Sequence, residues 1–298
     1  MNRLCGRSRQ RSGAALLLVT AACLNGCGAP SSDNTVDEKA SAEVTAGEQP
    51  KVNDTGVTAY IIDETYTDDT APPNTYSKNG AANNQSDFPT NQDAAFGDDV
   101  DHPDNSNGAA GLRFLRLDEN GAALSGSSGD YGASPWSCVK DQHTGLTWEV
   151  KTDPKDLNNP RRFIASYSWY DTNPNTNGGD EGLPDGGNCG NEIRCDTEAY
   201  VEYINQLNDG AGLCGVNNWR LPTREEVRSI VDYSITDGLM LDSRFFPNGS
   251  SKEEEIWTSQ TDVSDITRAW TVHISLNGHQ VHEKDLPNSV MLVSSDRQ

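Results

Sequence analysis

The sequence predicts an α+β domain in the second half of this 298-residue chain, and two observations support it. Apolar residues recur at helical spacing in two segments, 196–207 and 223–231. Segments with strand character then follow at 257–260, 270–276 and 290–293. Helices that precede a run of strands, without strict alternation, are typical of α+β architecture.

Both helices have recognisable start signals. Asp196 is placed to cap the first helix, whose apolar stripe begins at Tyr200. Thr223 and Glu226 form a capping box at the second, because the hydroxyl and the carboxylate can each satisfy a free backbone N–H. Pro222 stops the strand before it. The block WRLPT is therefore explained as architecture and requires no chemistry.

The C-terminal strands include a predicted hairpin with two histidines. Asn277-Gly278 is typical of a two-residue turn, which places His273 opposite His282 on one face of the sheet. With acidic residues at 283 and 285, the two imidazoles form a candidate transition-metal site or a pair that titrates together. The alternative is an ordinary solvated face of a hairpin.

Shorter strands are predicted upstream. Two apolar runs within 112–124 flank Asp118-Glu119-Asn120-Gly121, a hairpin signal. Segments 136–139 and 145–150 read as short strands around a turn, and 57–62 as one further strand.

The N-terminus has the features of an export signal. Residues 1–13 carry four arginines and no acidic residue, and an apolar run follows from Ala14 to Leu24. A bilayer span needs about 20 apolar residues, so this shorter run suits a signal peptide. It ends in Leu24-Asn25-Gly26-Cys27, which resembles the lipobox of bacterial lipoproteins.

That resemblance implies cleavage before Cys27 and acyl chains on it, and multiple acyl chains anchor a protein stably. Gly28 after the cysteine implies the outer membrane, facing the periplasm or the cell surface. Thr20-Ala21-Ala22-Cys23 is a competing cleavage site. The alternative is an ordinary secreted protein cut near Ala22 or Gly26.

Composition divides the chain into four parts. Residues 1–26 are the predicted signal peptide, and residues 27–50, with no aromatic residue, are a flexible, disordered tether. Residues 51–111 are rich in Asp, Asn, Pro and Gly and form a predicted loop-rich extension. Residues 112–298 form the predicted α+β domain.

The mature chain is strongly acidic. Cleavage after residue 26 leaves 19 basic and 45 acidic residues, a net charge of −26. Such a surface repels nucleic acid, anionic lipid and sulfated polysaccharide, and favours cations, basic partners or neutral ligands.

Four cysteines lie in the predicted domain, an even number in a chain that meets oxidising conditions, so two disulfides are expected. Cys189 and Cys195 bracket a short loop and are natural partners, which leaves Cys138 with Cys214. Four cysteines allow three pairings, so this pairing is a preference.

One polar loop is a candidate calcium site. Asp171, Asn173, Asn175 and Asp180 place side-chain oxygens at intervals, and calcium takes six to eight oxygen ligands. The alternative is a series of Asx turns, because these are also turn residues. Trp169 stands beside this loop and is the tryptophan expected to face a ligand such as a sugar ring.

A series of blocks in one order resembles the Lcl C-terminal domain family. The blocks are TGLTWEVKT at 144–152, CDTEAY at 195–200, LCG at 213–215, NNWRLPTREEVRSIVDYS at 217–234, FFPN at 245–248 and IWTSQT at 256–261. The resemblance implies a C-type-lectin-like fold, with two helices against a twisted antiparallel sheet and long loops. The name-giving member is a surface adhesin that binds host polysaccharide. Residues 290–294 lack the basic ending usual in the family, so binding to sulfated polysaccharide is not carried over.

No GxSxG, phosphate-binding loop, HExxH or CxxC motif occurs in the sequence, and we expect no enzyme activity. The predicted function is a lipid-anchored envelope protein displaying a lectin-like binding or adhesion domain for a glycan or surface partner. The first alternative is a structural or protein–protein interaction module of the outer membrane. The second alternative is an enzyme on this fold.

Overall fold

The structure is a computed structural model. It describes residues 59–61, 75–77, 105–109, 111–125, 130–153, 155, 157–235, 238–249, 255–275 and 278–295. By internal contacts the chain divides into two units, Met1–Gly47 and Glu48–Gln298, and all described residues belong to the second. The predicted signal peptide and lipidation site Cys27 lie outside the described residues.

The described strands form antiparallel sheets. Strands β1 (Ala59–Ile61) and β2 (Thr75–Ser77) pair with each other, and β1 falls within the strand predicted at 57–62. A larger sheet has the order β3-β4-β5-β9. Its strands are β3 (Phe114–Leu117), β4 (Cys138–Asp141), β5 (Thr147–Glu149) and β9 (Val293–Ser294).

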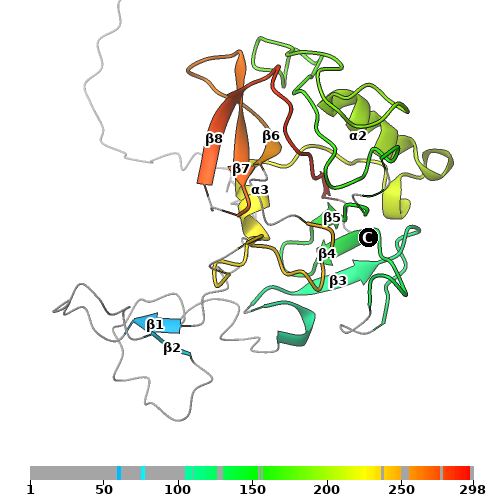
Figure 1. Cartoon of the computed structure of the whole chain (residues 1–298), viewed down its shortest axis with the longest axis vertical. Helices are drawn as coiled ribbons and strands as arrows, with labels where there is room; N and C mark the ends of the chain where they lie inside the picture. The colour runs from blue at the N-terminus through cyan, green and yellow to red at the C-terminus, as the bar shows by residue number, and fades with distance from the viewer. Residues whose placement is uncertain are drawn as a thin grey trace, which may run out of the picture. The chain divides into compact units, whose positions relative to one another are not determined.

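A separate sheet has the order β6-β7-β8 (Figure 1). Its strands are β6 (Glu255–Thr261), β7 (Arg268–His273) and β8 (Gly278–Glu283). The α+β class is confirmed, although the strands are divided between sheets rather than joined in one twisted sheet.

The two predicted helices are present with their predicted caps. In α2 (Thr197–Gln206), the side chain of Asp196 accepts the backbone N–H of Ala199 at 2.8 Å. In α3 (Arg224–Ser229), Thr223 and Glu226 form both halves of the capping box. Short 3₁₀ turns occur at η3 (Asn105–Asn107), η4 (Asn208–Gly210) and η5 (Leu213–Gly215).

The predicted turn at 118–121 forms, but its second arm is short. The Asp118 carboxylate accepts the backbone N–H groups of Asn120 and Ala122 at 2.9 and 2.8 Å. The arm after the turn forms one bridge, Leu117 with Ala123, on the edge of β3 that faces away from β4, and the N–H of Leu124 donates to the carbonyl of Arg116 at 3.0 Å. Strands β4 and β5 pair as the sequence predicts.

The register predicted for the C-terminal hairpin is wrong. His273 lies opposite Gly278 and His282 opposite Ala269, so four residues separate the two histidines along the ladder. At about 3.3 Å per residue, they are beyond cross-strand reach. The reason is that β7 ends at His273, and the carbonyl of Ile274 accepts the N–H of Met240 at 2.9 Å instead of a hairpin partner. The His282 ring lies against the carboxylate of Glu255.

Two hydrophobic clusters make the core. The first joins the four-stranded sheet to α3 and includes Trp148, Val227 and Phe245. The second lies around α2 and includes Trp169, Tyr200 and all four cysteines of the domain. None of the helices in the described part of the chain is long and apolar enough to cross a bilayer.

Candidate functional site

The loop predicted to bind calcium is organised by its own side chains. The Asp171 carboxylate accepts the N–H of Asn173 at 2.9 Å and the hydroxyl of Thr176 at 2.6 Å. Asn173 accepts the N–H of Asn175 at 3.0 Å, and Asp180 accepts the N–H of Gly182 at 2.9 Å. These are successive Asx turns, the alternative that the sequence left open.

A buried lysine holds the centre of this loop. Lys284 is 1% exposed, and its ammonium donates to the carbonyls of Asn177 and Asp180 at 2.9 and 2.6 Å. Its nitrogen also lies 4.1 Å from the centroid of the Trp169 ring, within cation–π distance. Burial lowers the pKa of Lys284, and the negative charges of Asp180 and Asp171 oppose that shift. The loop therefore closes around an ammonium supplied by the chain.

This arrangement does not fit a calcium ion at the centre of the loop. The backbone carbonyls of Asn177 and Asp180 accept from Lys284, and the positive charge of its ammonium would repel a divalent cation placed among them. Within the described residues, no group of three or more His, Cys, Asp or Glu side chains is placed to hold a metal ion. Calcium binding stays a prediction, and the loop geometry argues against it.

Trp169 is buried in the structure. Its side chain is 1% exposed, and its indole N–H donates to the carbonyl of Thr258 at 2.9 Å. The ring packs inside the second hydrophobic cluster with the Lys284 ammonium against it. Neither face of the Trp169 ring is open to a sugar, and the ring instead packs beneath the loop as part of the core.

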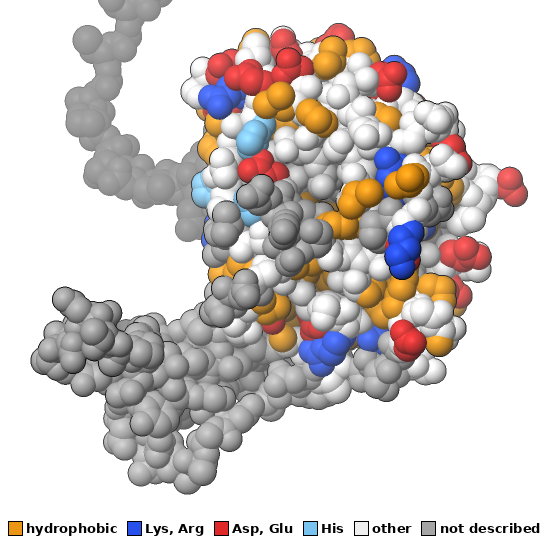
Figure 2. All heavy atoms as spheres, viewed as in Figure 1, with side chains coloured by type: hydrophobic (Ala, Val, Ile, Leu, Met, Phe, Trp, Pro, Cys, Tyr) orange, Lys and Arg blue, Asp and Glu red, His pale blue; other side chains and the backbone are white. Residues whose placement is uncertain are grey.

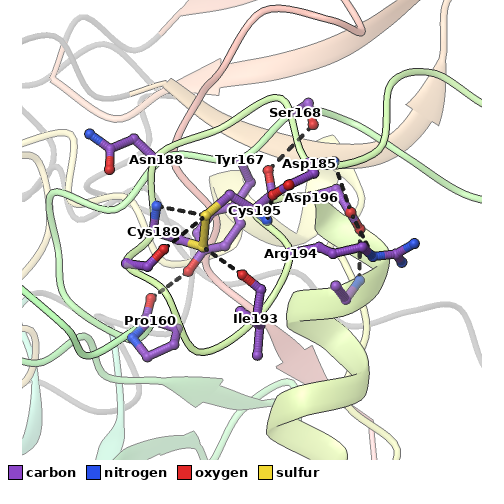
Figure 3. Close-up of a disulfide and its surroundings, with 12 residues drawn as sticks. Pro160, Tyr167, Ser168, Asp185, Asn188, Cys189, Ile193, Arg194, Cys195 and Asp196 are labelled. Carbon is purple, nitrogen blue, oxygen red and sulfur yellow. Dashed lines mark hydrogen bonds and ion pairs between the residues drawn. A yellow bond between two sulfur atoms is a disulfide. The ribbon is translucent and has the colours of Figure 1, made fainter.

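The end of the loop is tied to α2 by Asp185 and Asp196 (Figure 3). The N–H of Asp185 donates to Asp196 at 3.1 Å, and the Asp185 carboxylate accepts the N–H of Cys195 at 2.8 Å. Arg194 lies 3.3 Å from Asp196 as an ion pair. Because Asp196 also caps α2, one buried carboxylate fixes both the helix and the loop.

Both disulfides have the preferred pairing. Cys189–Cys195 closes a separation of 6 residues beside Asp185, and Cys138–Cys214 joins β4 to η5 across 76 residues. The short bridge therefore constrains the loop, whereas the long bridge ties distant parts of the domain together.

The loop lies at one end of the three-stranded sheet. We call this region the loop end, defined as residues 171–187, the β6–β7 turn at 262–267 and residues 283–287. The Thr261 hydroxyl donates to the carbonyl of Asn177 at 3.0 Å, and the N–H of Lys284 donates to the carbonyl of Thr267 at 3.0 Å. Figure 1 shows these segments together at the upper end of the sheet.

Exposed aliphatic side chains gather at the loop end. Val263, Ile266, Leu183 and Leu286 are 97%, 44%, 42% and 48% exposed. Figure 2 shows hydrophobic side chains lying among acidic ones at this upper end of the face in view. No pattern in the sequence indicates this surface, because single aliphatic residues in separate polar turns carry no periodic signal.

A buried polar cluster lies between β5 and α2. We call it the β5 cluster, defined as Glu149, Lys151, Arg161 and Tyr200. Glu149 is fully buried, and its carboxylate accepts from the Lys151 ammonium at 3.2 Å and from the Tyr200 hydroxyl. Arg161 lies 3.6 Å away. Burial and the Glu149 charge raise the pKa of Tyr200, so the phenol stays protonated and joins β5 to α2.

An apolar cavity lies beside this cluster and is lined by Phe163, Leu241, Ile256 and Met291, with Lys151 at its edge. Its space amounts to about 20 Å³. That is room for one water molecule and too little for a sugar ring.

One tryptophan keeps part of its ring in solvent. Trp136, Trp148, Trp169, Trp219 and Trp257 are all at most 3% exposed, whereas Trp270 on β7 is half-buried. The Arg224 guanidinium lies 4.3 Å from its ring centroid, and the His279 ring centroid lies at 5.5 Å. Trp270 is thus a better candidate than Trp169 for contact with a sugar.

Together these features define an α+β domain with disulfide-braced loops and a buried polar core. The model of the Lcl C-terminal domain matches residues 137–294, more than half of the chain, and the chain therefore belongs to this family. Strand β3 precedes the match but pairs with β4 inside it. No curated protein and no solved structure shows a significant match to the chain.

Proposed function

We propose that this chain is a lipid-anchored envelope protein whose Lcl C-terminal domain is a non-catalytic module that binds a glycan or a surface partner. The loop end carries the proposal. Asx turns, the Lys284 ammonium and the hydrogen bond from Asp185 to Asp196 hold the backbone of the loop in place. The aliphatic side chains of the loop end are exposed to solvent. A surface held in one shape loses little conformational freedom on binding, so it suits recognition.

Glycan arrays probed with the full chain, in calcium and in chelator, test the glycan form of this proposal. A sugar that stacks on Trp270 gives a signal that the Trp270→Ala variant loses. The matched control is Trp219→Phe, a change at a buried tryptophan that leaves the surface as it is. Absence of any glycan signal in either buffer would count against a lectin-like role.

A second candidate is a protein–protein interaction module of the envelope. The observation that favours it is that the exposed large hydrophobic side chains among the described residues are all Leu, Ile or Val. Sugar sites favour aromatic platforms, whereas aliphatic patches are typical of protein interfaces. Crosslinking in intact cells followed by identification of the crosslinked protein tests this candidate. Turnover of any substrate on a broad panel would contradict both binding functions as full accounts.

The anchor has its own test. Growth with an alkyne-labelled fatty acid should label the wild-type chain and leave the Cys27→Ser variant unlabelled. Cys23→Ser is the matched control, because it removes the competing cleavage site. Equal labelling of wild type and Cys27→Ser would contradict lipidation at Cys27.

A further inference from the structure

Three segments that are distant in sequence present one aliphatic surface at the loop end. Ile266 lies against the loop, because a methyl group on Gly179 would come within 3.6 Å of its Cδ1 atom. Leu183 follows Gly182, where a side chain would lie 2.0 Å from the carbonyl of Trp169 and 3.3 Å from Lys284 Cβ. Leu286 lies two residues after Lys284 and donates its N–H to the carbonyl of Glu283 at 3.0 Å. Lys284 therefore connects the segments that carry this surface, because it donates to carbonyls of the 171–187 loop and, through its backbone N–H, to the β6–β7 turn.

This surface holds four of the six large hydrophobic residues that are exposed in the described part of the chain. Of the large hydrophobic residues that are exposed there, Leu183, Val263, Ile266 and Leu286 belong to the loop end, and only Leu157 and Ile164 lie elsewhere. Val263 at the tip of the β6–β7 turn is 97% exposed and has no packing role that would explain its presence. A gathering of such residues marks a site of contact with a partner.

The charge of the loop end restricts the partner. Its three segments carry eight acidic residues, and Lys284 is their only basic residue. That ammonium is buried and bound to carbonyls, Asp262 is buried, and Arg268 lies 3.4 Å from Glu283 as an ion pair. The remaining acidic residues still outnumber the basic groups, so the surface carries an excess of negative charge. Like charge disfavours a second copy of this chain, anionic lipid and sulfated polysaccharide. Complementary charge favours a cationic partner.

We propose that the loop end docks a cationic protein segment whose contact face combines Lys or Arg with apolar side chains. This inference rests on the proposed binding function and names its partner class. The apolar side chains of the segment cover Val263 and Ile266, and its basic groups meet the surrounding carboxylates. Electrostatic attraction raises the association rate of any cationic segment. Contact with Val263 and Ile266 then favours segments that also carry apolar side chains.

The test measures the binding of fluorescent peptides to the full chain in nanodiscs of neutral lipid. One peptide alternates Lys with Leu, and a second alternates Lys with Ser, so the two share their charge. Empty nanodiscs give the partition of each peptide into lipid. We expect the Lys–Leu peptide to bind more tightly than the Lys–Ser peptide, and its affinity to fall with added salt.

Matched variants separate the surface from charge alone. Val263→Ser with Ile266→Ser should weaken the Lys–Leu peptide by about tenfold or more, which is the loss of about 1.4 kcal/mol of contact energy. Leu157→Ser with Ile164→Ser, the same change at the other exposed aliphatic residues, should leave the affinity unchanged. Glu181→Gln with Asp285→Asn should weaken both peptides, whereas Asp209→Asn with Glu225→Gln should not.

Three results would overturn the inference. They are equal affinity for the two peptides, equal loss in both aliphatic variants, or no binding of the Lys–Leu peptide. If the Lys–Leu peptide fails to bind while a glycan array gives a signal, the inference fails and the proposed binding function stands. If neither the peptides, nor a glycan, nor a crosslinked envelope protein is found, both fail.

Discussion

The β5 cluster and the loop end each contain a buried lysine, and a disulfide lies beside each of them, but the charge on each lysine is balanced differently and the two disulfides close loops of different length. Lys151 faces the carboxylate of Glu149, a full opposite charge, whereas Lys284 is held by two backbone carbonyls. The disulfide at the β5 side closes 76 residues, whereas the one at the loop closes 6. The comparison indicates that the β5 side holds the fold together and that the loop end holds one surface in shape.

The largest expected effect concerns the long disulfide. The Cys138→Ser, Cys214→Ser variant should lose about 4–5 kcal/mol of unfolding free energy, because a long loop is released in the unfolded chain. The Cys189→Ser, Cys195→Ser variant should lose only about 2 kcal/mol. Urea unfolding of both variants checks this, and a larger loss from the short bridge would break the comparison.

The next effect concerns Lys151. Lys151→Met should lower the unfolding free energy by about 3–4 kcal/mol, because it leaves the buried Glu149 carboxylate without its nearest cation. Adding Glu149→Gln should restore part of the loss, since it removes the buried charge. Urea unfolding of the single and double variants measures the coupling, and simple additivity of the two losses would contradict the account.

A smaller effect is expected at the loop end. Lys284→Met should lower the unfolding free energy by about 1–3 kcal/mol, because it leaves buried carbonyls without a donor but no buried charge without a counterion. Lys155→Met, at an exposed lysine, is the matched control and should change stability by less than about 0.5 kcal/mol. If Lys284→Met lowered the unfolding free energy as much as Lys151→Met does, the loop end would contribute to stability as much as the β5 cluster, contrary to the comparison above.

The pH dependence of α3 provides a further test. Burial would raise the pKa of Glu226, but hydrogen bonds from Arg220 and from the Thr223 backbone outweigh it and lower that pKa. A carboxylate with a lowered folded-state pKa stabilises the fold above its unfolded pKa and loses that effect as pH falls through the folded value.

Glu226→Gln should therefore cost about 0.5–1 kcal/mol at neutral pH. The difference from wild type should shrink as the solution is acidified and vanish below the folded-state pKa. Urea unfolding across acidic pH measures it, with Glu225→Gln, an exposed neighbour, as the control. A difference that is independent of pH would contradict the ion pair as its source.

Calcium should have the smallest effect. Because Lys284 already occupies the centre of the loop, the thermal unfolding midpoint should be the same in calcium and in EDTA at matched ionic strength. Magnesium is the control for nonspecific binding to acidic side chains. A rise specific to calcium, lost in Asp171→Ala with Asp180→Ala, would restore the calcium site that the sequence predicts.

Local signals in the sequence predicted much of this fold. The caps at Asp196 and Thr223 and the pairing of β4 with β5 depend on neighbouring residues, so the sequence carries them directly. The preferred cysteine pairing also needed only spacing. The Lcl family followed from the order of the blocks.

The parts that could not be predicted depend on contacts between distant residues. The hairpin register changed because Ile274 bonds to Met240, and nothing in the segment 270–282 indicates that contact. Lys284 stands between acidic residues in the sequence, as a solvated lysine would, and its burial under the loop depends on Trp169 and Asn177. The exposed aliphatic surface exists only once three separate turns are brought together.

The most direct test of the account is amide hydrogen exchange of wild type and Lys284→Met under native conditions. The amides of Asp171 and Asn177, which donate within the loop, should be protected in the wild type and exchange about 10- to 100-fold faster in the variant. The amide of Glu149, which donates to Leu292, should be unchanged. Unchanged exchange in the loop would contradict the claim that the Lys284 ammonium holds this surface in shape.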